Sequence, residues 1–281
     1  AKEGDGRRMR RISPASIVSW IVLLIMVLVT LLPIYVLGIN AIKQDVEVKA
    51  SPITFPSVLV WNNFPVAFVK GGFGVALLNS LKLVATSVIL VPVAGFAAYA
   101  LARMRVPGRL KWNTYLLLGM AVPPQLFLIP LYNNLSSLGL TNSHLGIIIV
   151  YIGIYIPFSV FFLRSFFLGM PKAVEEAALI DGCSSVQVVS RIILPMSRTA
   201  LLSLVLIIFT WVWNEFTFSV TLLQSDPLKT AATQYLSFVS SRDVDLSLVA
   251  ASGIITTIPI LILFICLQHY FIEGMTAGSV K

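Results

Sequence analysis

The sequence predicts an all-α membrane protein that crosses the bilayer six times. Of its 281 residues, 57% are apolar and only 11% are charged, and the mean hydropathy is +0.91. Soluble domains carry roughly a quarter charged residues, so this composition excludes a cytosolic enzyme, a disordered regulator and a disulfide-stapled secreted module. Six stretches are apolar and long enough to cross about 30 Å of hydrocarbon. They are residues 17–39, 75–101, 112–131, 145–163, 200–223 and 249–272.

The first stretch follows four arginines, as the apolar part of a signal peptide would. Its apolar run is longer than that of a signal peptide, and no small-residue cleavage site precedes the polar segment at Lys43, so we expect an uncleaved first span. The expected organisation is a cytoplasmic tail over residues 1–16, a transmembrane domain over 17–272 with a cytoplasmic loop at 165–199, and a cytoplasmic tail over 273–281.

Basic residues set the expected orientation. Fourteen of the 20 lysines and arginines fall in the N-terminal tail, the second and fourth connections and the C-terminal tail, five fall in the other connections, and Lys82 lies inside the second stretch. Lysine and arginine are enriched on the cytoplasmic side of membrane proteins, so both termini are expected inside the cell. Membrane orientation thus explains the net charge of +8, and we expect no nucleic-acid partner.

The first outer connection and the third stretch suggest where a partner and the solute would bind. The connection over residues 40–74 is rich in proline and aromatic residues and is expected to pack on the outer face, where it could meet a partner. Prolines at 123, 124 and 130 interrupt the third stretch, and backbone freed at such breaks is tolerated where it lines water. Candidate solute contacts near these breaks are Gln125, Tyr132, Asn133 and, in the fourth stretch, Tyr155.

Polar residues inside the fifth stretch are the next candidates. Asn214 and Glu215 lie mid-stretch beside Trp213, and burying such groups in lipid is costly unless they face a cavity. Amides and carboxylates bind sugar hydroxyls, and an aromatic face packs on the C–H side of a sugar ring, so all three are candidate substrate contacts. A structural pairing of Glu215 with another helix or with a partner subunit is equally open.

The 165–199 loop is predicted to hold two short helices. Pro171 suits a first helical position, residues 172–180 are mostly good helix formers, and Gly182 suits a left-handed helix end. From composition alone, this first helix could lie on the inner membrane surface or dock into a groove on a partner.

The second loop helix is predicted from its start and its end. Ser184, with Gln187 three residues later, is typical of a capping box. Leu194-Pro195 is expected to bend the chain toward the fifth stretch, because proline cannot continue a regular helix.

The order of residues in this loop resembles the signature loop of permease subunits in binding-protein-dependent ABC importers. The pattern is Glu176-Ala-Ala-x-x-Asp181-Gly182, followed after eleven residues by Leu194-Pro195, and it lies before the penultimate span. The resemblance covers essentially the whole chain and is closest to the maltose-transporter type of carbohydrate permease. Supporting segments are Asn79-Ser80-Leu81, residues 213–216 and residues 271–278. Cys183 in place of an alanine and Thr199 in place of a proline depart from the family pattern.

The resemblance implies the type I permease fold of ABC importers and half of a translocation pathway for a mono-, di- or oligosaccharide in a bacterial or archaeal plasma membrane. The first loop helix would be the coupling helix, seated in a cleft of a cytoplasmic ATPase. The implied partners are a second homologous permease, two copies of the ATPase, an extracytoplasmic binding protein, the sugar and membrane lipid. Residues implied in coupling are Glu175, Glu176, Ala177, Ala178, Asp181 and Gly182.

Individual roles follow from that resemblance. Glu176 would make a polar contact at the cleft rim and Gly182 would supply the turn, while Asp181 could either cap the next turn or pair with an ATPase arginine. The sequence contains no GxxxxGK[ST] nucleotide-binding motif, so we expect no enzymatic activity and no cofactor in this chain, with ATP and Mg²⁺ used by the partner.

Other functions stay open. An importer of a glycerophosphate or a polyol would share the same fold, although no arginine lies within a span. A proton- or sodium-coupled secondary transporter would need paired half-repeats and an intramembrane ion site, and Glu215 is the only acid well inside a stretch. A membrane enzyme or metal site is disfavoured because the cysteines, Cys183 and Cys266, and the histidines form no catalytic or metal-binding group.

Overall fold

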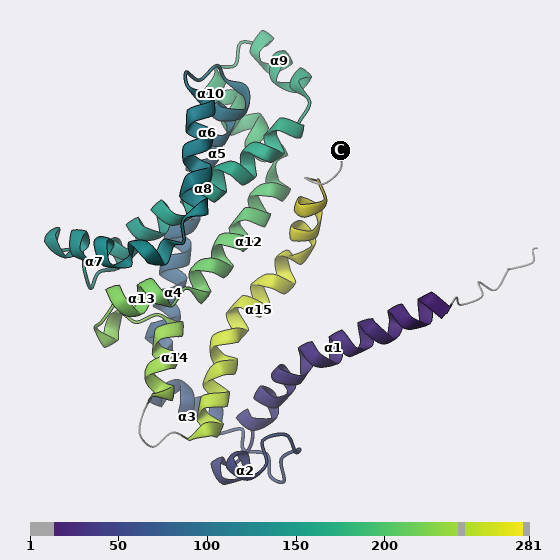
Figure 1. The fold of residues 1–281 in the computed structure, drawn as a ribbon, viewed down its shortest axis with the longest axis vertical. Coiled ribbons are helices and arrows are strands. Elements are labelled where there is room, and N and C mark those ends of the chain that lie inside the picture. The colour runs from purple at the N-terminus through teal and green to yellow at the C-terminus, as the bar shows by residue number, and fades with distance from the viewer. Residues whose placement is uncertain (1–13, 241–244, 278–281) are drawn as a thin grey trace, which may run out of the picture.

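The computed structural model describes residues 14–240 and 245–277, and every regular element within these residues is a helix (Figure 1). The all-α prediction is therefore confirmed. The N-terminal arginines, Arg242, Gly278 and Lys281 lie outside the described residues, as do the side chains of residues 271–277.

Four helices are long and apolar enough to cross a membrane, or up to six if each of two bent pairs is one span. The four are α1 (Pro14–Ala41), α8 (His144–Gly169), α15 (Leu246–Ala277) and the nearly continuous pair α4 (Phe73–Val88) and α5 (Leu90–Arg103). Their apolar residues form long continuous runs, as spans require. They match the first, second, fourth and sixth predicted stretches.

The third predicted stretch is bent. Helix α6 (Arg109–Ala121) ends before Pro123, and the 3₁₀ turn η1 (Pro124–Phe127) leads into α7 (Leu128–Ser137) at 88° to α6. Consecutive prolines supply no backbone N–H for a regular helix, which explains the break. The interruption was expected, but its size turns the second half of the predicted span nearly perpendicular to the first.

The fifth predicted stretch also differs from a straight span. Helix α12 (Arg198–Asn214) ends nine residues before the predicted limit at 223, and α13 (Thr217–Leu222) follows as a separate short helix. Before it, α10 (Ser185–Val188), the π-helical turn η2 (Val189–Ile193) and α11 (Leu194–Met196) meet α12 at 78°. The bend expected at Leu194-Pro195 is present but lies two residues later, at Ser197, because Pro195 occupies the first turn of α11, where a proline is tolerated.

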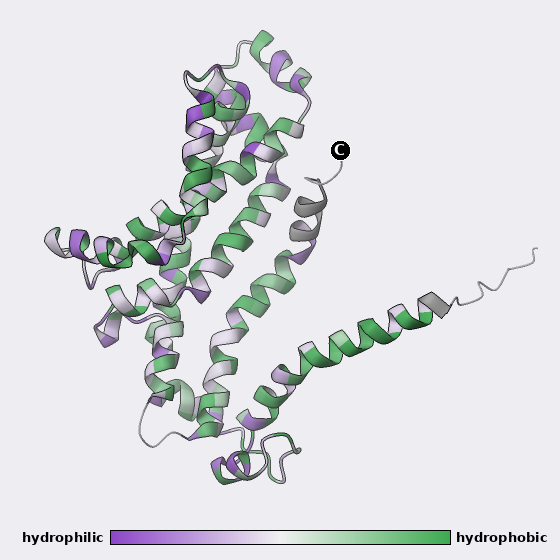
Figure 2. Cartoon of the chain, in the orientation of Figure 1, coloured by the Kyte–Doolittle hydropathy of each residue, from purple (hydrophilic) through white to green (hydrophobic). Residues whose placement is uncertain are grey.

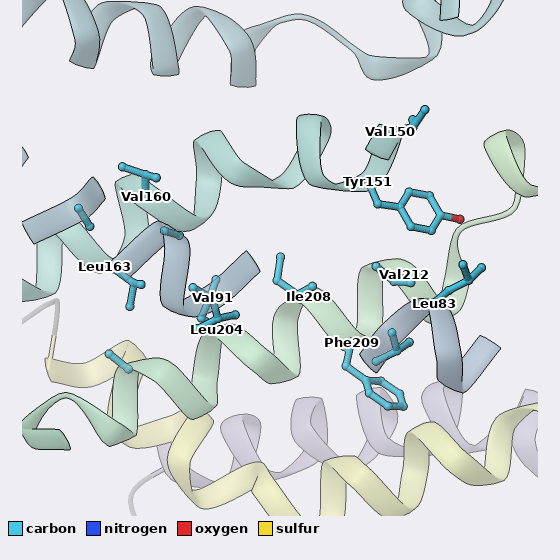
Figure 3. Packing of buried hydrophobic residues seen from close by; sticks show 14 of the residues in the cluster. Leu83, Val91, Val150, Tyr151, Val160, Leu163, Leu204, Ile208, Phe209 and Val212 are labelled. Atoms are coloured by element: carbon cyan, nitrogen blue, oxygen red, sulfur yellow. The ribbon is translucent and has the colours of Figure 1, made fainter. Parts of the chain in front are cut away.

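The core lies where α4, α5, α8 and α12 meet. Large apolar side chains fill it, and Figure 3 shows Leu83, Tyr151, Leu163, Leu204 and Ile208 among them. Such interlocking packing, rather than hydrophobic transfer from water, holds helices together within a bilayer.

Helix α1 diverges from this core (Figure 1). Residues 17–35 are all exposed, and the helix is apolar along its length (Figure 2). Only its end packs on the bundle, where Leu37 lies against Gly253 of α15. An apolar helix without neighbours in its own chain needs lipid or another chain around it.

The two ends of the molecule are built differently (Figure 1). One end carries α2 (Asp45–Ala50), α3 (Asn63–Lys70) and α14 (Ala231–Val239), and the opposite end carries α9 (Lys172–Ile180) and α10; the short turn η3 (Asp226–Leu228) contacts α4. The 40–74 connection is folded at the first end, where the buried Lys43 donates to the Ser51 carbonyl at 2.8 Å. Asn79 donates to the carbonyls of Pro227 and Lys229, so the Asn79-Ser80 segment fixes the loop after α13.

Candidate functional site: a surface helix and a cavity at a helix break

Helix α9 is built as its sequence predicts. It begins at Lys172, one residue after Pro171, and it ends where Gly182 adopts a φ of +85°. A left-handed backbone there suits glycine, because other residues clash through their Cβ. Ser184 and Gln187 form the predicted capping box, with Ser184 N donating to Gln187 Oε1 at 2.8 Å.

The predicted coupling residues divide between two faces of α9. Glu175 and Ala178 are buried against the rest of the chain, whereas Glu176, Ala177, Asp181 and Gly182 are exposed. The Asp181 side chain makes no hydrogen bond within the described residues, so the interpretation as a local cap has no contact to support it. Ile180 adds an apolar side chain with 86% of its surface exposed.

Glu175, one of the residues implied in coupling, makes its contacts within this chain. Its Oε1 lies 3.0 Å from Nε of Arg103, and its Oε2 accepts a hydrogen bond of 3.2 Å from the Tyr99 hydroxyl. The cause is the position of Arg103 at the last turn of α5, which brings a cation to the inner face of α9. The exposed face is left to Glu176 and the residues that follow it.

A cavity of about 530 Å³ lies where α12 stops. Its walls come from the α6–η1 break, from α8 and from the end of α12. The polar and aromatic residues that line it are Gln125, Tyr155, Phe158, Thr210, Trp211, Asn214, Glu215 and Phe218. Four of the predicted pathway residues are therefore brought together, from three segments far apart in sequence.

Aromatic rings form one wall of this cavity. The Trp211 ring lies 5.5 Å from that of Tyr155 and 4.6 Å from that of Phe158, measured between centroids. The Asn214 amide donates to the Thr210 carbonyl at 2.9 Å, and the residue is exposed. Aromatic faces beside amide groups match the two sides of a sugar ring, one of C–H and one of hydroxyl groups.

Glu215 does not sit mid-helix as expected. It is the residue at which α12 ends, and its carboxylate accepts hydrogen bonds from the backbone N–H groups of Phe218 (2.8 Å) and Ser219 (3.0 Å). The Tyr151 hydroxyl donates a third at 2.8 Å. A carboxylate before a helix N-terminus satisfies N–H groups that have no helical partner. The structural interpretation of Glu215 therefore has direct contacts to support it.

Trp213 faces away from this cavity. It is buried, stacks on Phe209 with centroids 5.5 Å apart, and donates Nε1–H to the Thr256 carbonyl at 3.1 Å. It borders a second cavity of about 510 Å³ between α12, α14 and α15, which also includes Asn214. Its role in the structure is chiefly to join α12 to α15.

Two further candidate residues lie apart from the 530 Å³ cavity at the end of α12. Tyr132 is half-buried against the core and Asn133 is exposed on α7, and neither lines that cavity. Trp211, which the sequence analysis did not select, does line it. Helical spacing could have found it, because residues two apart face opposite sides and residues three apart share one side, as Trp211 and Asn214 do.

The fold and these sites define a multi-pass membrane protein with a surface helix at one end and a polar, aromatic cavity between its helices, the class to which transport subunits belong. The chain belongs to the family described as binding-protein-dependent transport system inner membrane component, whose sequence profile matches residues 90–277. The family predicted from the 176–182 pattern is therefore confirmed, and it is a transport family rather than an enzyme family.

Relatives agree with this assignment, and a solved structure shares the fold. The probable ABC transporter permease protein YurM of Bacillus subtilis is 33% identical over 263 residues, covering 93% of this chain and 87% of the relative. The diacetylchitobiose uptake system permease protein NgcG of Streptomyces coelicolor is 31% identical over 285 residues, covering 100% and 92%. A chain of a bacterial ABC transporter that imports alginate shares the fold, with a TM-score of 0.79, 22% identity and coverage of 93% and 98%.

Proposed function

We propose that this chain is the permease subunit of an ATP-driven importer that carries a sugar across a bacterial or archaeal plasma membrane. The observation that carries the proposal is the aromatic and amide-lined cavity at the end of α12, in a family whose member NgcG is named for diacetylchitobiose uptake. None of the described residues that line this cavity is lysine or arginine, which favours an uncharged sugar over a glycerophosphate.

The proposed topology has six spans with both termini in the cytoplasm. Counting each bent pair as one span gives up to six crossings. Arg103, Arg164 and Lys172 lie at the α9 end, whereas Lys43 and Lys49 lie at the opposite end with α2. By the positive-inside rule, α9 would lie in the cytoplasm and α2 outside, with a transmembrane domain over 17–272 and an inserted loop over 165–199.

Two exposed surfaces support the proposed partners. The exposed face of α9, with Glu176, Asp181 and Ile180, would seat in a cleft of a cytoplasmic ATPase. The exposed apolar length of α1 would pack on a second, homologous permease, because one small bundle makes too narrow a pathway for a sugar. Two ATPase copies, which use ATP and Mg²⁺, and an extracytoplasmic binding protein complete the importer, and this chain itself would hold no cofactor.

The mechanism follows from this placement. Closure of the two ATPases around ATP would displace the clefts in which the coupling helices sit, and α9 would carry that displacement into the helices that line the cavity. The binding protein would deliver sugar to the outer side, and the change in helix positions would open the cavity to the inside.

The test is to reconstitute the full chain in liposomes with the second permease, the ATPase and the binding protein. Sugar and binding protein should stimulate ATP hydrolysis and uptake, and Glu176→Lys should reduce both by more than about tenfold while the chain still inserts, because a reversed charge would face the cleft. Lys111→Glu, an exposed charge reversal on α6, is the matched control and should have no such effect. Uptake that needs no ATPase and follows a proton gradient would contradict the proposal.

A further inference from the structure

Arg103 joins three helices at the α9 end of the molecule. Its side chain, 6% exposed, extends from the last turn of α5. One terminal nitrogen donates to the carbonyls of Phe167 at 2.6 Å and Met170 at 2.5 Å, which lie at the C-terminal end of α8. Its Nε faces Glu175 of α9 at 3.0 Å.

These contacts offset the cost of burying charged groups, with Arg103 Nε and Glu175 Oε1 paired by charge and not by an aligned hydrogen bond. Carbonyls at a helix C-terminus have no helical partner, and they attract a cation through the helix dipole. Glu175 is itself only 7% exposed, so its charge needs a partner, which Arg103 supplies together with the Tyr99 hydroxyl. Tyr99 and Arg103 are four residues apart on α5 and so share the helix face that meets α9.

The position of the Arg103, Glu175 and Tyr99 side chains matters as much as the stability that their contacts supply. Met170 and Pro171 connect α8 to α9, and Arg103 contacts both the Met170 carbonyl and, beyond it, Glu175. The chain could otherwise turn at this connection and let α9 rotate against α8. Arg103 therefore fixes α9 to two spans, while the opposite face of α9, with Glu176, Ala177 and Ile180, stays exposed.

We propose that Arg103, with Glu175 and Tyr99, forms a coupling strut that makes α5, α8 and α9 move as one unit. This inference rests on the proposed function, in which an ATPase displaces α9. Glu175 and Arg103 are then positioning residues for coupling, and neither needs to touch the ATPase or the sugar. Breaking the strut leaves α9 able to move without carrying the spans, so ATP is hydrolysed with less transport.

The experiment measures sugar uptake and ATP hydrolysis together in the reconstituted four-component importer. Glu175→Gln removes the charge and keeps the side-chain size. We expect the ATPase to copurify in unchanged amount, and the ratio of sugar transported to ATP hydrolysed to fall by about tenfold. Tyr99→Phe, which keeps the ion pair and removes one hydrogen bond, should lower the ratio in the same direction by a smaller factor.

Two comparisons make the outcome decisive. Arg105→Gln removes an exposed arginine two residues from Arg103 and should leave the ratio unchanged. A purely structural role for Glu175 would lower uptake and hydrolysis in proportion to the amount of assembled complex, so an unchanged ratio in Glu175→Gln overturns the strut. If Glu175→Gln does not assemble, the ratio in Tyr99→Phe decides in the same way. If the wild-type complex shows no sugar-stimulated hydrolysis, the proposed function itself is wrong, and the strut falls with it.

Discussion

Helix α9 and the end of α12 each carry two adjacent polar residues. In each place one side chain is bound by other groups of this chain and its neighbour is exposed. On α9, Glu175 is buried against Arg103 while Glu176 is exposed. At the end of α12, Glu215 is bound by Tyr151 and backbone N–H groups while Asn214 is exposed at the cavity. The residue that the fold needs and the residue that a ligand or partner can reach are therefore neighbours in both regions.

The two regions differ in what holds the buried acid. Glu175 is held by a cation from another helix, so the contact joins elements that are separate in the chain. Glu215 is held mainly by N–H groups three and four residues ahead, so the contact fixes a local break between α12 and α13. The first arrangement suits the transfer of motion between helices, and the second suits a rigid wall beside a cavity.

The largest effect is expected from truncating the buried tryptophan of α12. Trp213→Ala removes the stack on Phe209 and the hydrogen bond to Thr256. We expect a loss of about 3 kcal/mol, at the low end for aromatic truncations because burial within a bilayer lacks the transfer term from water. The midpoint of thermal unfolding of the purified chain in detergent checks this. A drop in sugar affinity with an unchanged unfolding midpoint would show instead that Trp213 contacts the sugar.

The next effect tests whether Glu215 is held as rigidly as its contacts indicate. Glu215→Ala leaves the N–H groups of Phe218 and Ser219 without their acceptor and leaves the Tyr151 hydroxyl with only its contact to the Ser219 hydroxyl, at a cost of about 2 kcal/mol. The same unfolding measurement should show the loss. Glu215→Gln keeps an acceptor oxygen and serves as the control, with a smaller loss expected. Unchanged stability in Glu215→Ala would return Glu215 to the group of substrate contacts.

The helix boundaries, turn and cap of the 165–199 loop could be predicted from sequence in detail. The start of α9, the left-handed Gly182 and the Ser184 capping box depend on residues within four positions of one another, and all are found as expected. The family also followed from this loop. Such features are encoded by short-range sterics and hydrogen bonds, which the sequence shows directly.

The sites depended on contacts that the sequence does not show. Nothing near Glu175 predicts Arg103, which is 72 residues away, and the same holds for Tyr151 and Glu215, which are 64 residues apart. The end of α12 was placed nine residues too late because apolar residues continue past Glu215, although its carboxylate caps a new helix there. Hydropathy reports which residues tolerate lipid, and it does not report where a helix is interrupted.

A third prediction concerns Trp211, the exposed tryptophan of α12. Trp211→Ala removes the central ring of the cavity wall between Tyr155 and Phe158. On the proposed function, the sugar concentration for half-maximal uptake should rise by about tenfold, a loss of about 1.4 kcal/mol in binding. The unfolding midpoint should change much less than in Trp213→Ala, which is its matched comparison. The opposite pattern would assign the sugar to the cavity bordered by Trp213.

The smallest effect separates local from long-range control of α9. Ser184→Ala removes the capping box of α10 and should cost about 1 kcal/mol, measured by thermal unfolding, whereas Ser185→Ala at the next, exposed position should cost less. If Arg103 holds α9, this loss should leave the ratio of sugar transported to ATP hydrolysed unchanged, because the ion pair to Glu175 is intact. A fall in that ratio as large as the one in Glu175→Gln would mean that the turn after α9, and not the contact with α5, fixes the position of the helix.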